Sequence, residues 1–161
     1  PCGYRGDPNR DCQCTVPQVE RYMSKISGPL LDRIDIHLEV SAVPFHELAA
    51  KQPGTSSDAI REQVGVAREI QQKRFEHSRS LGHRWNARMT TREVRHHCHI
   101  EKKPMDLLRT AVSTLGLSAR AHDKVLRVAR TIADLDRAET ICVQHISEAT
   151  QYRLLDRKLW T

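Results

Sequence analysis

Apolar residues recur at helical spacing through most of the second half of the chain. Between positions 119 and 135 they stand three and four residues apart, so they form one stripe along a helix. This stripe consists of Ala121, Val125, Val128, Ala129, Ile132 and Leu135. A second stripe, within 57–79, consists of Ile60, Val64, Ala67 and Ile70. The pattern therefore predicts two amphipathic helices that each bury one face.

Capping signals predict where the neighbouring helices begin and end. Thr90 and Glu93 have the spacing of a capping box, which predicts a short helix that ends at about residue 98. Pro104 suits the first turn of the next helix, and Gly116 suits its end. These signals divide the second half of the chain into several short helices.

A single segment, 34–40, alternates apolar and polar residues with the period of two that is typical of a strand. Because a strand needs hydrogen-bonded partners, we expect the other strands of its sheet to come from sequence that precedes Pro1. A short helix is expected over 17–26, ended by the Gly28-Pro29 break, and a final helix over 144–155.

These elements predict a mainly α chain in three parts. Residues 1–45 are expected to be a remnant of an α/β core, with one short helix and one strand. Residues 46–56, which contain Pro, Gly and Ser, form the expected linker, and residues 57–161 a helical bundle. The chain has no initiator Met, so we expect Pro1 to follow a cut inside a longer protein.

The composition agrees with a soluble, helical, cytoplasmic protein. Aromatic residues make up only 4% of the chain, which favours helices over a sheet sandwich. No apolar run approaches the roughly 20 residues of a membrane span, and no signal peptide is visible. The 5 cysteines, without a secretory context, predict reduced thiols. The net charge of +6 permits a nucleotide or nucleic-acid partner, or reflects solvated helix faces.

Arg33 is the first candidate for binding chemistry. It stands just after the Gly28-Pro29 break, at the start of the expected strand, and loops at strand ends are where sites are built in α/β sheets. The plainer alternative is a surface ion pair between Arg33 and Asp32 or Asp35. The residue pattern alone leaves both interpretations open.

Arg120 is the second candidate. If Ser118 is the N-cap of the long helix, Arg120 falls in its first turn, where a cation opposes the helix macrodipole. A bound phosphate would reverse the sign of that interaction, since helix N-termini bind anions. The plainer alternative is that Arg120 pairs with Asp123 or Glu148, or points into water.

A group of histidines surrounds Cys98, and Cys142 lies far from it in sequence. Adjacent histidines on a helix point in different directions, so His96, His97 and His99 are not expected to converge with Cys98 on one ion. Cys142 is interpreted as a small core residue. We therefore expect no metal site at either cysteine.

Several segments together carry a resemblance to a known family. The most specific has the sequence SGPLLDRIDIHLEV, and the Cys-rich opening of the chain precedes it at the family's spacing. On these motifs the chain resembles the magnesium-chelatase-like AAA+ ATPases. Within that family it is most similar to the bacterial competence-protein type. The matching segments are 1–4, 6–8, 12–14, 27–40, 56–75, 115–135 and 145–153. In that family the helical bundle is the lid of the ATPase.

The resemblance implies a role for each arginine. Arg33 falls on the arginine finger, which reaches the ATP site of the neighbouring subunit and stabilises the transferring phosphoryl group. Arg120 falls on the sensor-2 arginine, which contacts the γ-phosphate of its own subunit. The resemblance further implies a hexameric ring that couples ATP hydrolysis to movement on DNA, as in branch migration or helicase action.

The chain contains no phosphate loop of the form Gly-x-x-x-x-Gly-Lys-Ser/Thr. ATP and Mg²⁺ are therefore expected to bind in the longer protein from which this chain is expected to come, here called the parent. Residues 1–161 alone should bind no nucleotide and hydrolyse none. The parent ring would consist of identical subunits, with no membrane partner.

The resemblance also implies a small zinc site in the parent. Cys2, Cys12 and Cys14 lie in a loop rich in Gly, Pro and Asp, and the family has another Cys two residues before Cys2. Four thiolates suit structural zinc. Because three are present here, the site in this chain is expected to be incomplete.

A stand-alone basic helical module that binds DNA is the alternative from another class. Its support is the positive charge and the run of Arg and His over 83–103. The scarcity of aromatic residues counts against single-strand binding, which relies on base stacking.

Overall fold

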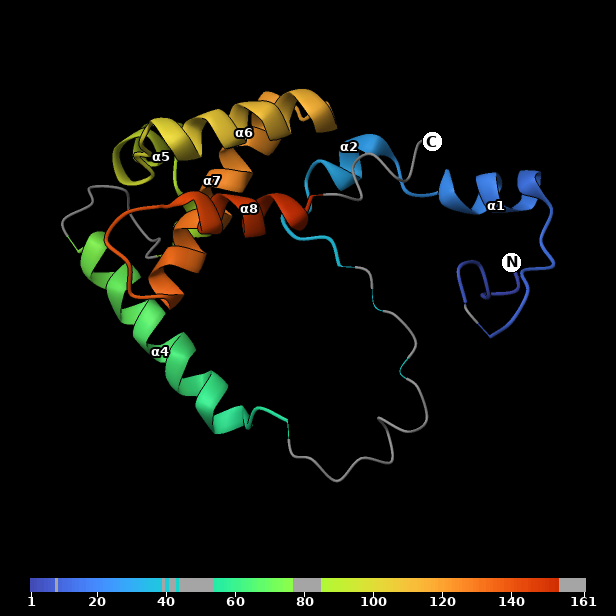
Figure 1. Cartoon of the computed structure of the whole chain (residues 1–161), viewed down its shortest axis with the longest axis horizontal. Helices are drawn as coiled ribbons and strands as arrows, with labels where there is room; N and C mark the ends of the chain where they lie inside the picture. The colour runs from blue at the N-terminus through green and yellow to red at the C-terminus, as the bar shows by residue number, and fades with distance from the viewer. Residues whose placement is uncertain (8, 39, 41–42, 44–53, 77–84, 154–161) are drawn as a thin grey trace.

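The computed structural model describes residues 1–7, 9–38, 40, 43, 54–76 and 85–153. These residues are mainly helical, as the sequence predicts, and helices α4 to α8 pack into one bundle (Figure 1). Helix α1 and the N-terminal loop lie to one side of this bundle. Among the described helices, none is both long and apolar enough to cross a membrane.

Helix α7, Ala119–Leu135, is the centre of the bundle because it packs against α4, α5, α8 and the 3₁₀ helix η1. Ser118 is its N-cap, as predicted, and its hydroxyl accepts a hydrogen bond from the Ala121 N–H at 3.1 Å. The predicted apolar stripe faces the core, where Val125 and Ala129 are fully buried. Leu135, at the end of the stripe, is 42% exposed.

The predicted caps of α5 and α6 are confirmed. Helix α5, Thr91–His97, begins with the capping box, in which the Glu93 carboxylate accepts from the Thr90 N–H at 2.7 Å. Helix α6, Lys102–Leu115, has Pro104 in its first turn and ends at Gly116, whose φ of 63° lies in the left-handed region. Glycine adopts that conformation without steric cost, so it terminates the helix cleanly.

Helix α8, Val143–Gln151, packs between α6 and α7. It starts close to the predicted position and ends at Gln151, before the predicted end, because residues 152 and 153 form a turn. Residues 154 and 155 of the predicted helix lie outside the described part. Ile146 and Ala149 are its core residues. Cys142 is half-buried and stands at the N-cap of α8, so it is less enclosed than the core position predicted for it.

Helix α4, Ser57–Arg74, joins the bundle only through its second half. Ala67 is buried there, whereas Ile60 is 49% exposed although it belongs to the predicted apolar stripe. The reason is that the first two turns extend beyond α7 and meet no other helix (Figure 1). The helix ends at Arg74, with Phe75 as its C-cap, earlier than the predicted residue 79. Residues 77–79 of that prediction and most of the predicted linker 46–56 lie outside the described residues.

Buried polar groups fasten α4 and η1, Asn86–Arg88, to α7. The Asp134 carboxylate, which is fully buried, accepts from Arg74 Nη1 and from Asn86 Nδ2, each at 2.7 Å. Arg130, one turn earlier on α7, donates to it through Nε at 3.1 Å. Gln71 Oε1 accepts from the Asn86 N–H at 3.1 Å. We call these five residues the Asp134 network.

The N-terminal part differs from the prediction in one element. Helix α1, Val16–Met23, forms close to the predicted position but ends before residue 26, and a short helix α2, Gly28–Leu31, begins at the expected break. Residues 34–38 form no strand, since no partner strand lies beside them in the described chain. Their alternating apolar side chains remain exposed, with Ile36 at 47% and Leu38 at 66%.

Candidate functional site

Arg33 stands one residue beyond the C-cap of α2, on a segment that lies against the helical bundle. Its side chain is exposed, and Nη1 donates to the carbonyl oxygen of Pro29 at 2.7 Å. The predicted alternative pairs do not form around it, because Asp32 and Asp35 make their ion pairs with residues of the bundle. The guanidinium therefore folds back onto its own segment, held by one neutral acceptor.

Asp32 joins this segment to the N-terminus of α7. Its Oδ1 accepts from the Ser118 hydroxyl at 2.8 Å, and its Oδ2 lies 3.7 Å from Arg120 Nη1. A carboxylate at this position is favourable because it meets the positive end of the helix macrodipole. Arg120, 61% exposed, therefore pairs with Asp32, and in the described part of the chain it forms no ion pair with Asp123 or Glu148.

Two buried cations of the bundle reach consecutive carbonyl groups of the Arg33 segment. Lys124 Nζ donates to the carbonyl oxygen of Arg33, and Arg153 Nη1 donates to that of Ile34. Lys124 also lies 2.6 Å from Asp35 Oδ1. We call Lys124 and Arg153 the carbonyl clasp. Through it, α7 and the second residue after α8 hold the Arg33 segment.

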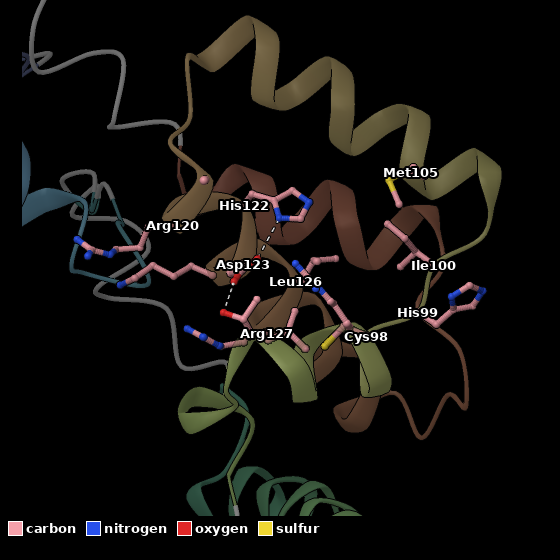
Figure 2. Close-up of a pocket in the computed structure, with 14 residues that line it drawn as sticks. Cys98, His99, Ile100, Met105, Arg120, His122, Asp123, Leu126 and Arg127 are labelled. Atoms are coloured by element: carbon pink, nitrogen blue, oxygen red, sulfur yellow. Dashed lines mark hydrogen bonds and ion pairs between the residues drawn. The ribbon is translucent and has the colours of Figure 1, made fainter.

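Arg120 also lines a pocket of about 970 Å³ between α5 and the first half of α7. Figure 2 shows Arg120 at one end of this pocket, with His99 and Met105 at the opposite end. The single carboxylate in the lining, that of Asp123, lies 3.2 Å from His122 Nδ1. The basic residues of the lining are Arg95, His99, Arg120, His122, Lys124 and Arg127. This excess of positive charge suits an anionic ligand.

The cysteines of the N-terminal loop converge. The sulfur atoms of Cys2, Cys12 and Cys14 all lie within 4.8 Å of one another, and those of Cys2 and Cys12 are 3.6 Å apart. Backbone N–H groups of Tyr4 and Gln13 lower the pKa of Cys2 to about 6, because they stabilise the thiolate. The loop therefore presents a ready thiolate with two further sulfur atoms beside it.

Cys98 is a core residue. It is 4% exposed and its sulfur lies 3.8 Å from that of Met89. Burial raises the pKa of this thiol to about 11. Burial also lowers the pKa of His97, whose ring packs edge-on against Phe75 and His96.

Comparison with known proteins gives the family. Residues 54–153 match the family model described as magnesium chelatase, subunit ChlI C-terminal, and residues 1–48 match that of magnesium chelatase, subunit ChlI. This chain belongs to the magnesium chelatase ChlI family. The family resemblance predicted from the sequence is therefore confirmed.

Relatives of this ChlI-family chain include bacterial proteins of considerable similarity. YifB of Escherichia coli is 40% identical over 157 residues, and YifB of Salmonella typhimurium is 38% identical over 159. The competence protein ComM of Haemophilus influenzae is 37% identical over 158 residues. Each match covers 97% of this chain. The chain spans 29% of the length of each of these three relatives.

Sequence reasoning missed part of the contacts around Arg33 in this ChlI-family chain. Lys124 gave a usable signal, since it stands three residues after Ala121 and four before Val128 and therefore on the apolar face of α7. A lysine on a buried face needs an acceptor from another part of the chain. Arg153 and the role of Asp32 gave no such signal.

Proposed function

We propose that this chain is the C-terminal part of an AAA+ ATPase and that it supplies two arginines to ATP hydrolysis. Arg33 is the arginine finger, which acts on the ATP of the neighbouring subunit. Arg120 is the sensor-2 arginine, which contacts the γ-phosphate within its own subunit. We use "the parent" for a longer protein in which residues 1–161 are joined to a phosphate-loop segment. ATP and Mg²⁺ bind in the parent.

The observation that carries this proposal is the contact between Asp32 and the N-terminus of α7. Asp32 and Ser118 are 86 positions apart in sequence, and their hydrogen bond places Arg33 and Arg120 on facing elements. Both guanidinium groups are exposed, and each is held by a contact that a phosphate can replace: one carbonyl for Arg33 and a 3.7 Å ion pair for Arg120. Arginine suits phosphate because its planar fork donates two parallel hydrogen bonds.

An arginine finger acts across a subunit interface, so the proposal implies a ring of identical subunits, which we take to be a hexamer. The similarity to the competence protein ComM supports a motor that moves on DNA, of the branch-migration or helicase type. Within the parent we assign 1–45 to the end of the α/β core, 46–56 to a linker and 57–161 to the lid. Magnesium insertion into a porphyrin is the competing activity suggested by the family description.

The alternative of a stand-alone DNA-binding module receives less support. Trp85 is partly exposed, and the guanidinium of Arg68 stacks on one face of its ring, with Cζ 5.4 Å from the ring centroid. That arrangement leaves one face of the ring occupied and so weakens it as a base-stacking platform. Membership of the ChlI family favours the ATPase.

The divided site predicts that residues 1–161 alone do not bind ATP at micromolar concentration. An exposed ion pair contributes at most about 1 kcal/mol, whereas millimolar affinity already requires about 4 kcal/mol. Arg120 supplies one such contact, and the phosphate loop is absent from the sequence. Titration of isotope-labelled chain with Mg-ATP, followed by NMR, should leave the amides of Ser118, Arg120 and Asp123 unshifted. Saturable shifts there at micromolar nucleotide would contradict the divided site.

We further propose that the loop of Cys2, Cys12 and Cys14 belongs to a structural zinc site. Zinc bonds to thiolates at about 2.3 Å, so the sulfur atoms of a tetrahedral site lie roughly 3.8 Å apart. The separation of 3.6 Å between the Cys2 and Cys12 sulfur atoms, and the 4.8 Å limit for all three, fit this spacing. When bound, zinc would hold the loop as a compact unit, with a fourth ligand completing the site.

Zinc is expected to protect this loop from alkylation. The thiolate is the nucleophile, and coordination removes it, so saturating Zn²⁺ should slow iodoacetamide labelling of Cys2, Cys12 and Cys14 by at least about tenfold. Cys142 is the internal control, because it lies outside the cluster and should react at the same rate with and without zinc. Peptide mass spectrometry after a timed reaction measures each cysteine separately. Equal labelling of the loop with and without zinc would show that these cysteines do not bind zinc.

A further inference from the structure

The two cations of the carbonyl clasp are buried. The side chain of Lys124 is 9% exposed and that of Arg153 is 1% exposed. A buried cation is costly to desolvate unless acceptors surround it, so its contacts are the reason it is tolerated there. In both residues those contacts include a main-chain carbonyl of the Arg33 segment.

The clasp acts on the backbone that carries Arg33. The carbonyl groups of Arg33 and Ile34 belong to consecutive peptide units on either side of the Ile34 Cα, and holding both fixes the orientation of the backbone that follows Arg33. A third contact follows, in which the His37 N–H donates to the carbonyl oxygen of Tyr152 at 2.9 Å. The base of the Arg33 side chain is thereby fixed relative to α7 and α8, while its guanidinium is held, as far as the described residues go, by the Pro29 carbonyl alone.

We propose that Lys124 and Arg153 are positioning residues for the arginine finger. They hold the Arg33 backbone against the bundle, so that a movement of α7, on which Arg120 also lies, moves the finger with it. In this way the state of one subunit's nucleotide, sensed at Arg120, reaches the finger that serves the next subunit. This inference rests on the proposed function of Arg33 and Arg120.

The first test uses residues 1–161 and needs no ATPase activity. Lys124→Met removes the ammonium group and keeps most of the apolar stem. Within 34–38, the N–H groups of Ile34 and His37 are hydrogen-bonded to backbone carbonyls. We expect exchange at these two amides to accelerate at least about tenfold, while the amides of Val125 and Ala129 in the centre of α7 stay protected. Lys103→Met is the matched control, because Lys103 is exposed on α6 and contacts neither Arg33 nor Asp35. Unchanged exchange at 34–38 in Lys124→Met would overturn the inference.

The second test measures turnover by the parent. Misplacing a catalytic group by about 1 Å costs on the order of 100-fold in rate, so Lys124→Met should lower kcat by about 10- to 100-fold. KM for ATP should stay within about twofold, because the finger serves the transition state rather than ground-state binding. Lys124→Arg keeps a cationic donor and should recover most of the lost turnover. A merely structural lysine would give no such separation of kcat from KM.

The outcomes separate this inference from the proposed function. If Arg33→Ala turns over ATP normally, the function proposed for Arg33 is wrong. If Arg33→Ala is inactive while Lys124→Met turns over normally, only the positioning role is wrong. Should Lys124→Met fail to fold, Asp35→Asn serves instead, because it loosens Lys124 from a half-exposed partner and leaves the core intact. It should accelerate exchange at 34–38 and lower kcat by a smaller factor, and no change in either would overturn the inference.

Discussion

Replacing Arg33 by alanine is expected to abolish ATP turnover by the parent while leaving ATP binding almost unchanged. An arginine finger stabilises charge that develops on the phosphoryl group only in the transition state, and its loss typically costs on the order of 10³-fold or more in rate. Among the described residues, its exposed guanidinium makes one hydrogen bond, to the Pro29 carbonyl, so the substitution should not disturb the fold. Steady-state hydrolysis and equilibrium binding of a fluorescent nucleotide measure the two effects separately.

Two controls distinguish a finger acting in trans from a general loss of function. Arg21→Ala removes an exposed arginine from the last turn of α1 and should leave turnover unchanged. Arg33→Ala subunits mixed equally with subunits lacking the phosphate-loop lysine should regain activity at about a quarter of the interfaces, since each variant supplies what the other lacks. Normal turnover by Arg33→Ala alone, or no recovery on mixing, would remove Arg33 from the neighbouring ATP site.

Replacing Asp134 by alanine is expected to destabilise the fold by about 3–5 kcal/mol. The Asp134 carboxylate is fully buried and accepts hydrogen bonds from Arg74, Arg130 and Asn86. Its removal leaves two guanidinium groups, both largely enclosed, without their counter-charge. Such a loss is a large fraction of the 5–15 kcal/mol by which domains are usually stable. Urea unfolding followed by circular dichroism measures it.

Asp106→Ala is the matched control for Asp134→Ala. Its carboxylate is half-exposed and lies 3.6 Å from Arg109, so its removal should change the free energy of unfolding by less than about 0.5 kcal/mol. Asp134→Asn keeps the shape of the side chain and removes its charge. Its loss in the free energy of unfolding should lie between those of Asp134→Ala and Asp106→Ala. A loss below about 1 kcal/mol for Asp134→Ala would show that the network contributes little to stability.

Helix boundaries set by local chemistry could be predicted from the sequence. The Thr90–Glu93 capping box, the Ser118 N-cap and the left-handed Gly116 depend on residues within one turn, so the pattern contains them. The strand over 34–40 could not be judged in this way, because a strand forms only beside a partner. Likewise, the exposure of Ile60 depends on how far the bundle extends along α4, which its own periodicity does not contain.

The candidate site was predictable only in its two arginines. Arg33 and Arg120 were identified by their places beside a break and a helix start, and by family resemblance. The partners that hold them come from elsewhere: Asp32 pairs with Arg120, and Lys124 reaches the Arg33 carbonyl 91 positions away. Contacts at such separation depend on the packing of α7 and α8, which no local pattern encodes.

Helix α4 is attached to the bundle by its C-terminal half, and its N-terminal end is free of contacts with the other described helices. Residues 57–63 are exposed on every side, while the end of the helix is fastened through Arg74 to Asp134. At 1.5 Å per residue the helix is about 27 Å long, so a rotation of about 10° at this fulcrum displaces Ser57 by roughly 4–5 Å. A small tilt of α4 against α7 would thus displace the free N-terminal end of α4 by several times more than its attached end.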